Sequence, residues 1–247
     1  MSATLQVYEI GENMGFFYGF DWTYLVFILP CVIVSMICQA KVTSAFSKYS
    51  KITNSRNMTG AQAAEYVLRQ NGVSGVRIEQ VSGKLTDHFD PRTNVIRLSD
   101  SVYASNSVAA VGVAAHEAGH AVQHAQNYLP NKIRSVILPL ANIGSKLSWF
   151  LILFGILFTA KIGYVMLYAG ILLFSFSVLF TLVTLPVEFN ASKRALETIK
   201  NGELLYGEEY KGAKSVLTAA AMTYVASALT AIMQLLRLLF IAGRRRD

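Results

Sequence analysis

Charged residues and cysteines are scarce in this 247-residue chain. Charged residues make up 15% of it and hydrophobic residues 53%, whereas an average soluble domain is about 25% charged. The two cysteines, Cys31 and Cys38, are too few for a disulfide framework or a cysteine-ligated zinc site. These shortages exclude a disulfide scaffold and indicate a membrane protein, in which both cysteines serve as apolar packing residues.

The chain also lacks nucleotide-binding motifs and the basic start of a cleavable signal peptide. Neither the phosphate-binding pattern G-x-x-x-x-G-K-[ST] nor the dinucleotide pattern G-x-G-x-x-G occurs, which argues against a nucleotide enzyme. The first 21 residues contain Glu9, Glu12 and Asp21 but no lysine or arginine. Since a cleavable signal peptide has a basic n-region, we expect the first apolar run to be an uncleaved anchor.

Long uncharged runs predict the membrane helices. Residues 22–40 and 162–187 are 19 and 26 residues without a charge, long enough to span a bilayer. Residues 147–160 are short for a span, but extend back through Lys146 to about residue 138, and Lys161 and Gly163 mark a turn after them. Residues 216–242 carry one charge, Arg237, and a polar stripe at helical spacing. This segment predicts a membrane-associated helix whose crossing the sequence leaves open.

The basic residues lie beside these apolar runs. Lys41, Lys48, Lys51 and Arg56 follow the first run without an intervening acid, so the positive-inside rule predicts that this side is cytoplasmic and the N-terminus outside. The net charge of +7 could suggest nucleic-acid binding. We expect no nucleic-acid partner, because basic groups beside apolar spans, and in the tail at residues 244–246, are typical of contact with anionic lipid.

The polar segment after the first span predicts a small α+β unit. Thr59 and Gln62 form a capping-box pattern at the start of a helix that Gly72 could end. Residues 75–81 alternate apolar and polar side chains, as a half-buried strand does. A strong turn signal at residues 90–94 lies within the β-prone segment 85–98, so two or three strands are expected.

The most informative pattern is His116-Glu117-Ala118-Gly119-His120, which reads H-E-x-x-H within a helical run, residues 107–126. Positions four apart lie on one face of a helix, so both imidazoles can bind one metal ion. Glu117 can then reach water at that ion and act as general base, the layout of a zinc hydrolase. The alternative is a helix whose histidines only form hydrogen bonds.

A catalytic zinc site needs a third protein ligand. His124 continues the stripe, but three residues at i, i+4 and i+8 span ~12 Å along a helix and do not converge on one ion. Gln126 stands where the metzincin pattern has its third histidine. A site-2-type protease would need a Leu-Asp-Gly aspartate in a span, and none of the five aspartates fits: Asp21, Asp87, Asp90, Asp100 and Asp247.

Glu188 is the best remaining candidate for the third ligand. It is the first charged residue after the long apolar run, and a downstream glutamate on a second helix is the gluzincin arrangement. It could instead be a carboxylate favoured at a helix start by the macrodipole. Four other glutamates stay open as alternatives: Glu197, Glu203, Glu208 and Glu209.

The chain resembles a known family in these motifs. The N-terminal anchor, the segment L-T-D-H-F-D-P-R at residues 85–92, A-A-H-E-A-G-H-A at 114–121 and L-P-V-E-F-N-A-S at 185–192 are similar to the YugP-like bacterial membrane zinc metallopeptidases. A more distant similarity is to the HtpX and CAAX-prenyl-protease type, in which the ligand glutamate opens E-x-x-x-D; here Ser192 stands at the aspartate position. The resemblance implies Zn²⁺, endopeptidase activity and a multi-pass location in the bacterial cell membrane.

The predicted fold is a mainly α integral membrane protein with three to four membrane helices and a small α+β zincin-like catalytic unit. The expected segments are an anchor at 1–40, the α+β unit at 41–131, a membrane hairpin at 132–187, the third-ligand helix and loop at 188–214, and a C-terminal helix and basic tail at 215–247. The sequence does not indicate an oligomeric state.

The predicted function is hydrolysis of protein or peptide substrates at the bilayer by a zinc-activated water. His116, His120 and Glu188 would bind the metal, Glu117 would act as general base, and the site would lie on the cytoplasmic side. His88 could donate to the tetrahedral intermediate, or simply bond within its turn. The alternatives are a non-catalytic zinc-binding membrane protein, a scaffold with an inert motif, and a metallohydrolase acting on lipid esters.

Overall fold

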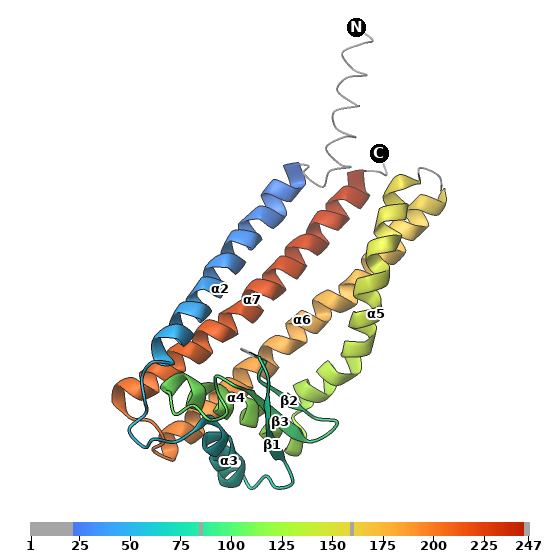
Figure 1. Cartoon of the computed structure of the whole chain (residues 1–247). Helices are drawn as coiled ribbons and strands as arrows, with labels where there is room; N and C mark the ends of the chain where they lie inside the picture. The colour runs from blue at the N-terminus through green and yellow to red at the C-terminus, as the bar shows by residue number, and fades with distance from the viewer. Residues whose placement is uncertain (1–21, 84–85, 159–160, 245–247) are drawn as a thin grey trace. The chain divides into compact units, whose positions relative to one another are not determined.

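The computed structural model describes residues 22–83, 86–158 and 161–244 (Figure 1). Helices dominate this part of the chain, with one small sheet. The elements are η1 (Tyr24–Ile28), α2 (Leu29–Tyr49), α3 (Gly60–Gln70), β1 (Arg77–Val81), β2 (His88–Asp90), β3 (Val95–Ser99), α4 (Val108–Ala125), α5 (Leu129–Leu157), α6 (Lys161–Asn201) and α7 (Gly207–Arg244).

Within the described residues, four helical stretches are long and apolar enough to cross a membrane: Tyr24–Tyr49, Leu129–Leu157, Lys161–Asn201 and Gly207–Arg244. The predicted mainly α membrane fold is therefore confirmed, and the last apolar segment joins the candidate spans. Lys161 begins α6 instead of lying in a turn. The sequence predicted that a new helix begins at residue 188. Instead, α6 continues through both Pro186 and residue 188.

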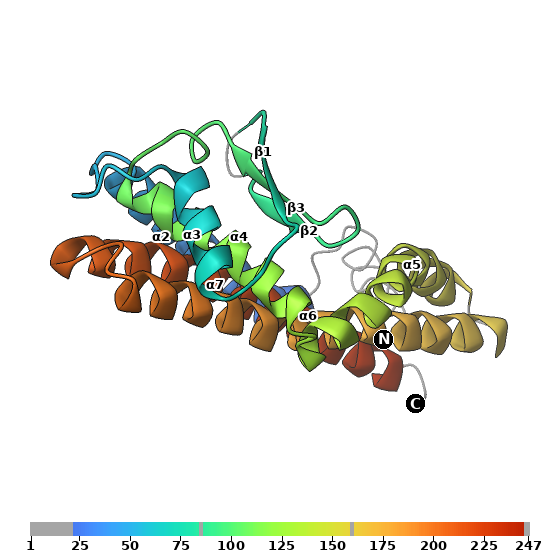
Figure 2. The same cartoon turned by 90° about the horizontal axis from the view of Figure 1, so that it is seen from below.

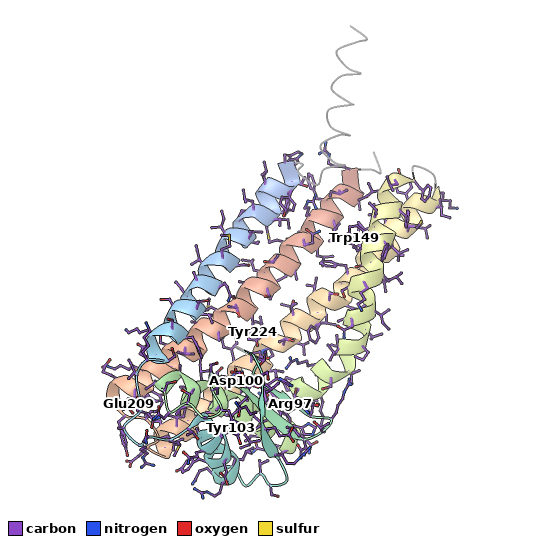
Figure 3. The ribbon with its side chains drawn as sticks, viewed as in Figure 1. Arg97, Asp100, Tyr103, Trp149, Glu209 and Tyr224 are labelled. Atoms are coloured by element: carbon purple, nitrogen blue, oxygen red, sulfur yellow. The ribbon has the colours of Figure 1, made fainter. Side chains whose placement is uncertain are left out.

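The chain divides into two compact units. The first, which we call the apolar unit, comprises residues up to Ile37, Ile137–Thr181 and residues from Ala226 onward. Within it α5 and α6 pack closely, since a Cβ on Gly155 would lie 2.5 Å from the backbone nitrogen of Leu167. Such close approach at small residues is typical of membrane helix pairs. The exposed side chain of Trp149 on α5 suits contact with lipid (Figure 3).

Arg237 in the apolar unit forms the polar contacts that a charged side chain in a span requires. Its Nε donates to the Thr23 hydroxyl at 3.0 Å, and its guanidinium lies 5.5 Å from the centre of the Tyr24 ring.

Cys31 and Cys38 are both buried, and neither forms a disulfide. Their apolar packing role is thereby confirmed.

The second unit, which we call the catalytic unit, comprises Cys38–Val136 and Leu182–Val225. Its sheet has the order β1-β3-β2, with β1 parallel and β2 antiparallel to β3 (Figure 2). The predicted capping box at Thr59 is present at the start of α3. Hydrogen bonds from the Thr93 hydroxyl and the Arg92 amide hold the pKa of Asp90 at about 2, so the turn between β2 and β3 keeps an ionised carboxylate.

One hydrophobic core connects the elements of the catalytic unit. Val67 of α3, Ile96 of β3, Val111 of α4 and Ile199 of α6 are fully buried in it. Burial of such side chains contributes about 1.5–3 kcal/mol each relative to exposure. This core holds α4, which carries the H-E-x-x-H motif, against the sheet and α6.

Candidate metal centre and active site

Helix α4 presents the two motif histidines as the sequence predicts. The Ser107 side chain caps its N-terminus by accepting from the Ala110 amide at 3.2 Å. One turn apart on the same face, His116 and His120 bring their Nε2 atoms to 3.1 Å from each other. Both rings are largely buried, with side chains 14% exposed.

Glu188 completes a triangle of ligand atoms from α6. Its Oε2 lies 3.4 Å from Nε2 of His116 and 3.4 Å from Nε2 of His120. Atoms bonded to one tetrahedral zinc ion at ~2.0–2.2 Å lie ~3.3–3.6 Å apart. Both distances from Glu188 are within this range, and the 3.1 Å between the two histidines is just below it. Among the described residues, His116, His120 and Glu188 form a cluster positioned to bind a metal ion.

The hydrogen-bonding state of these atoms also fits a cation. Oε2 of Glu188 is buried and has no hydrogen-bond partner within the described part of the chain, a costly state for a carboxylate oxygen. For His120, burial lowers the pKa, but the Glu188 carboxylate and the charge of Glu117 outweigh it and raise the pKa above its ordinary value. The three ligand atoms therefore converge on a position that favours a positive charge.

Gln123 fixes the tautomer of His120. Its amide nitrogen donates to the Val187 carbonyl at 2.7 Å and to Oδ1 of Asn190 at 3.0 Å. The amide oxygen thus faces Nδ1 of His120, at 3.1 Å, and accepts its proton. Nε2 of His120 is left with a lone pair aimed at the metal position, the usual arrangement for a zinc-binding histidine.

Ser192 supports the other histidine. Its hydroxyl lies 3.1 Å from Nδ1 of His116, one helical turn after Glu188 on α6. At the position where the related pattern has an aspartate, a neutral hydroxyl thus contacts the imidazole. Ser192 brings no negative charge to this imidazole, unlike an aspartate at the same position.

Gly119 allows α4 and α6 to approach closely enough for the cluster to form. A Cβ at this position would lie 2.7 Å from the carbonyl oxygen of Ala191. Backbone atoms cannot yield as a flexible side chain can, so any larger residue would push the helix of His116 and His120 away from the helix of Glu188.

Glu117 lines a cavity of about 160 Å³ together with His116, Glu188 and Ser192. Its side chain is buried, 9% exposed. Tyr224 of α7, which is labelled in Figure 3, is another of the residues that line this cavity. The general-base candidate thus shares one space with two of the ligand residues.

Sequence reasoning missed Arg134 and Tyr224. Nη1 of Arg134, near the start of α5, lies 3.4 Å from Oε1 of Glu188, the carboxylate oxygen that does not face the histidines. This ion pair leaves Oε2 for the metal. Neither residue belongs to a motif, so nothing in the sequence alone distinguishes them.

The other candidates lie elsewhere. The His88 imidazole bonds the Thr86 carbonyl at 2.8 Å, while it is Asp87 that lines the cavity. The His124 ring contacts Phe89, with ring centres 5.8 Å apart. The four alternative glutamates interact with other side chains: Glu197 with Lys193, Glu203 with Tyr206, Glu208 with Lys211 and Glu209 with Ser55.

Comparison with known proteins gives a consistent result. A family model described as "Putative neutral zinc metallopeptidase" matches residues 24–243. A protein of Bacillus subtilis (strain 168), named "Putative membrane protease YugP", is 44% identical over 216 residues, which are 87% of this chain and 94% of that protein. No solved structure shows a significant match. The match over nearly the whole chain, with a His-His-Glu cluster spaced for Zn²⁺, places this membrane protein in that neutral zinc metallopeptidase family.

Proposed function

We propose that the protein is a zinc-dependent endopeptidase in which Glu117 is the general base. The observation that carries this proposal is the triangle of His116, His120 and Glu188, together with the buried Glu117 carboxylate that lines one cavity with His116 and Glu188. A structural zinc site usually has four protein ligands. Three protein ligands leave the fourth coordination position open for water, and Glu117 is then placed to accept a proton from that water.

His116, His120 and Glu188 would hold Zn²⁺, which when bound supplies a Lewis acid that polarises the substrate carbonyl and acidifies water. Glu117 would accept the proton of the attacking water and deliver it to the leaving amine. Arg134 would keep the Glu188 carboxylate oriented, and the exclusion of solvent around Glu117 strengthens its interactions.

Strand β2 offers a place for an extended substrate. It is an edge strand of the sheet and packs against α4. An extended peptide could add to this edge by main-chain hydrogen bonds, which provide affinity without requiring a particular sequence.

Metal removal tests the proposal. The protein, purified in detergent, should contain about one zinc ion per chain and cleave members of a peptide library. Dialysis against a chelator should abolish cleavage, because the proposed reaction needs the metal to polarise the carbonyl and acidify water. Adding stoichiometric zinc should restore cleavage. Undiminished cleavage by the zinc-free protein would contradict the proposal, and stoichiometric zinc without any cleavage would favour a non-catalytic zinc protein.

We further propose that the catalytic unit is cytoplasmic. Lys41 and Lys48 lie in the last part of the first candidate span, Tyr24–Tyr49, and Lys51 and Arg56 follow it. Lysines and arginines concentrate on the cytoplasmic side. Single cysteines introduced at Lys51 and Arg56 should resist a membrane-impermeant thiol reagent in intact cells and react after lysis. Labelling of either position in intact cells would reverse the assignment.

A further inference from the structure

The catalytic cavity has one polar wall and one apolar wall. The polar wall carries His116, Glu117 and Glu188. The apolar wall comes from α2 and α7 and is formed by Val42, Phe46, Val216, Leu217, Ala220 and Ala221. With a volume of about 160 Å³, this cavity is small beside the ~300–1,000 Å³ of typical small-molecule sites, which suits a single side chain.

Charge disfavours acidic side chains in this cavity. Besides Glu117 and Glu188, it is lined by Asp87, whose carboxylate accepts from the amide and the hydroxyl of Ser99 at 2.8 and 3.0 Å. A carboxylate placed against the apolar wall would lose its hydration and face the Glu117 and Asp87 carboxylates, whereas Arg134 offsets the charge of Glu188. An apolar side chain would meet the aliphatic wall without that penalty.

A second cavity adjoins the first. It has a volume of about 560 Å³ and shares Ser192, Leu217 and Ala221 with the catalytic cavity. We call it the basic groove, because Lys193, Lys200 and Lys214 line it together with a single acid, Glu197, for a net charge of +2. The catalytic cavity and the basic groove therefore lie next to each other along α6 and α7.

Two of the three lysines are available to a ligand. Lys193 pairs with Glu197 at 3.8 Å. Among the described residues, Lys200 and Lys214 form no ion pair, and both are exposed. A groove with unneutralised cationic groups attracts an anionic partner and rejects a cationic one.

We infer that the substrate places one apolar side chain in the catalytic cavity, next to the scissile bond, and acidic side chains along the basic groove. This inference depends on the proposed peptidase function and specifies its substrate class. An anionic lipid headgroup has the same charge as an acidic peptide, but a lipid site has no reason to share its lining with the cavity of Glu117. The shared residues favour the substrate.

The cavity is tested by filling and enlarging it. On a peptide library read by mass spectrometry, the zinc-loaded parent should favour a leucine-sized side chain at one position flanking the cut. Ala220→Phe should lower the preference for leucine over alanine there by roughly 10- to 200-fold, and Phe46→Ala should admit larger side chains. Ala219→Phe, on the same helix but outside the cavity, should keep the parent's preference.

The basic groove is tested by charge reversal. The doubly substituted Lys200→Glu, Lys214→Glu protein should change the ratio of kcat/KM for an acidic over a basic peptide by on the order of 10-fold, in favour of the basic one. Raising the salt concentration should reduce the parent's preference for the acidic peptide. Lys211→Glu, on α7 outside the groove, should leave the ratio unchanged.

The possible outcomes distinguish a failure of the proposed peptidase function from a failure of the proposed substrate preference. A zinc-loaded parent that cleaves no peptide would overturn both the proposed function and this inference. Cleavage with no apolar or acidic preference, or a preference unaffected by these substitutions, would overturn the inference and leave the peptidase intact. A charge reversal that changes binding to anionic vesicles but not peptide preference would assign the lysines to lipid.

Discussion

Substituting Glu117 by glutamine is expected to lower kcat/KM by about 10²- to 10⁴-fold while zinc content stays at about one ion per chain. The amide has the size of the carboxylate but cannot accept a proton from the attacking water. Since Glu117 is outside the ligand triangle of His116, His120 and Glu188, the metal should be retained. Peptide hydrolysis and elemental analysis of the same sample measure both effects.

Glu65→Gln is the matched control for this substitution. Glu65 lies exposed on α3, in the same unit, and undergoes the same chemical change. It should retain the parent's activity. If the Glu117→Gln protein is as active as the parent, Glu117 is not the general base, and another group beside the cavity must take the proton.

Substituting Glu188 by glutamine is expected to weaken zinc binding by more than ~100-fold, since loss of a mere supporting partner of a ligand costs 10- to 100-fold. The amide is a poorer ligand than a carboxylate, and it leaves Arg134 without its anion. A competition titration with a fluorescent zinc chelator measures the affinity. Circular dichroism and thermal unfolding would show whether the protein still folds.

Glu197→Gln provides the comparison for Glu188. Glu197 lies on the same helix, paired with Lys193 at the surface, and was an alternative third ligand by sequence alone. Its substitution should leave zinc affinity unchanged. Tight zinc binding by the Glu188→Gln protein, with loss in the Glu197→Gln protein, would transfer the ligand role to Glu197.

Local patterns predicted most of the secondary structure of the catalytic unit. The capping box at Thr59 and the turn at residues 90–94 each depend on side chains within a few residues, and both are present. The continuity of α6 was not predictable in this way. A proline usually ends or bends a helix, yet Pro186 lies within a helix of 41 residues.

In the candidate site too, some residues could be predicted from local patterns and others could not. The spacing of His116 and His120 follows from the helical period, so their convergence could be predicted from the motif. Glu188 could be proposed only by elimination, because 67 residues lie between it and His120, including one whole candidate span and most of a second. Arg134 and Tyr224 had no signal at all, since their proximity to the site exists only after the helices pack.

By itself, the sequence determined the class of protein: a membrane chain with two imidazoles and a carboxylate arranged on one helix for zinc chemistry. Those features depend on composition and on the helical period, which are local properties. The tertiary structure decided which carboxylate meets the histidines, which groups orient them, and what lines the cavity. These depend on the approach of α4 to α6 at Gly119 and Ala191, a contact between backbones that no local pattern encodes.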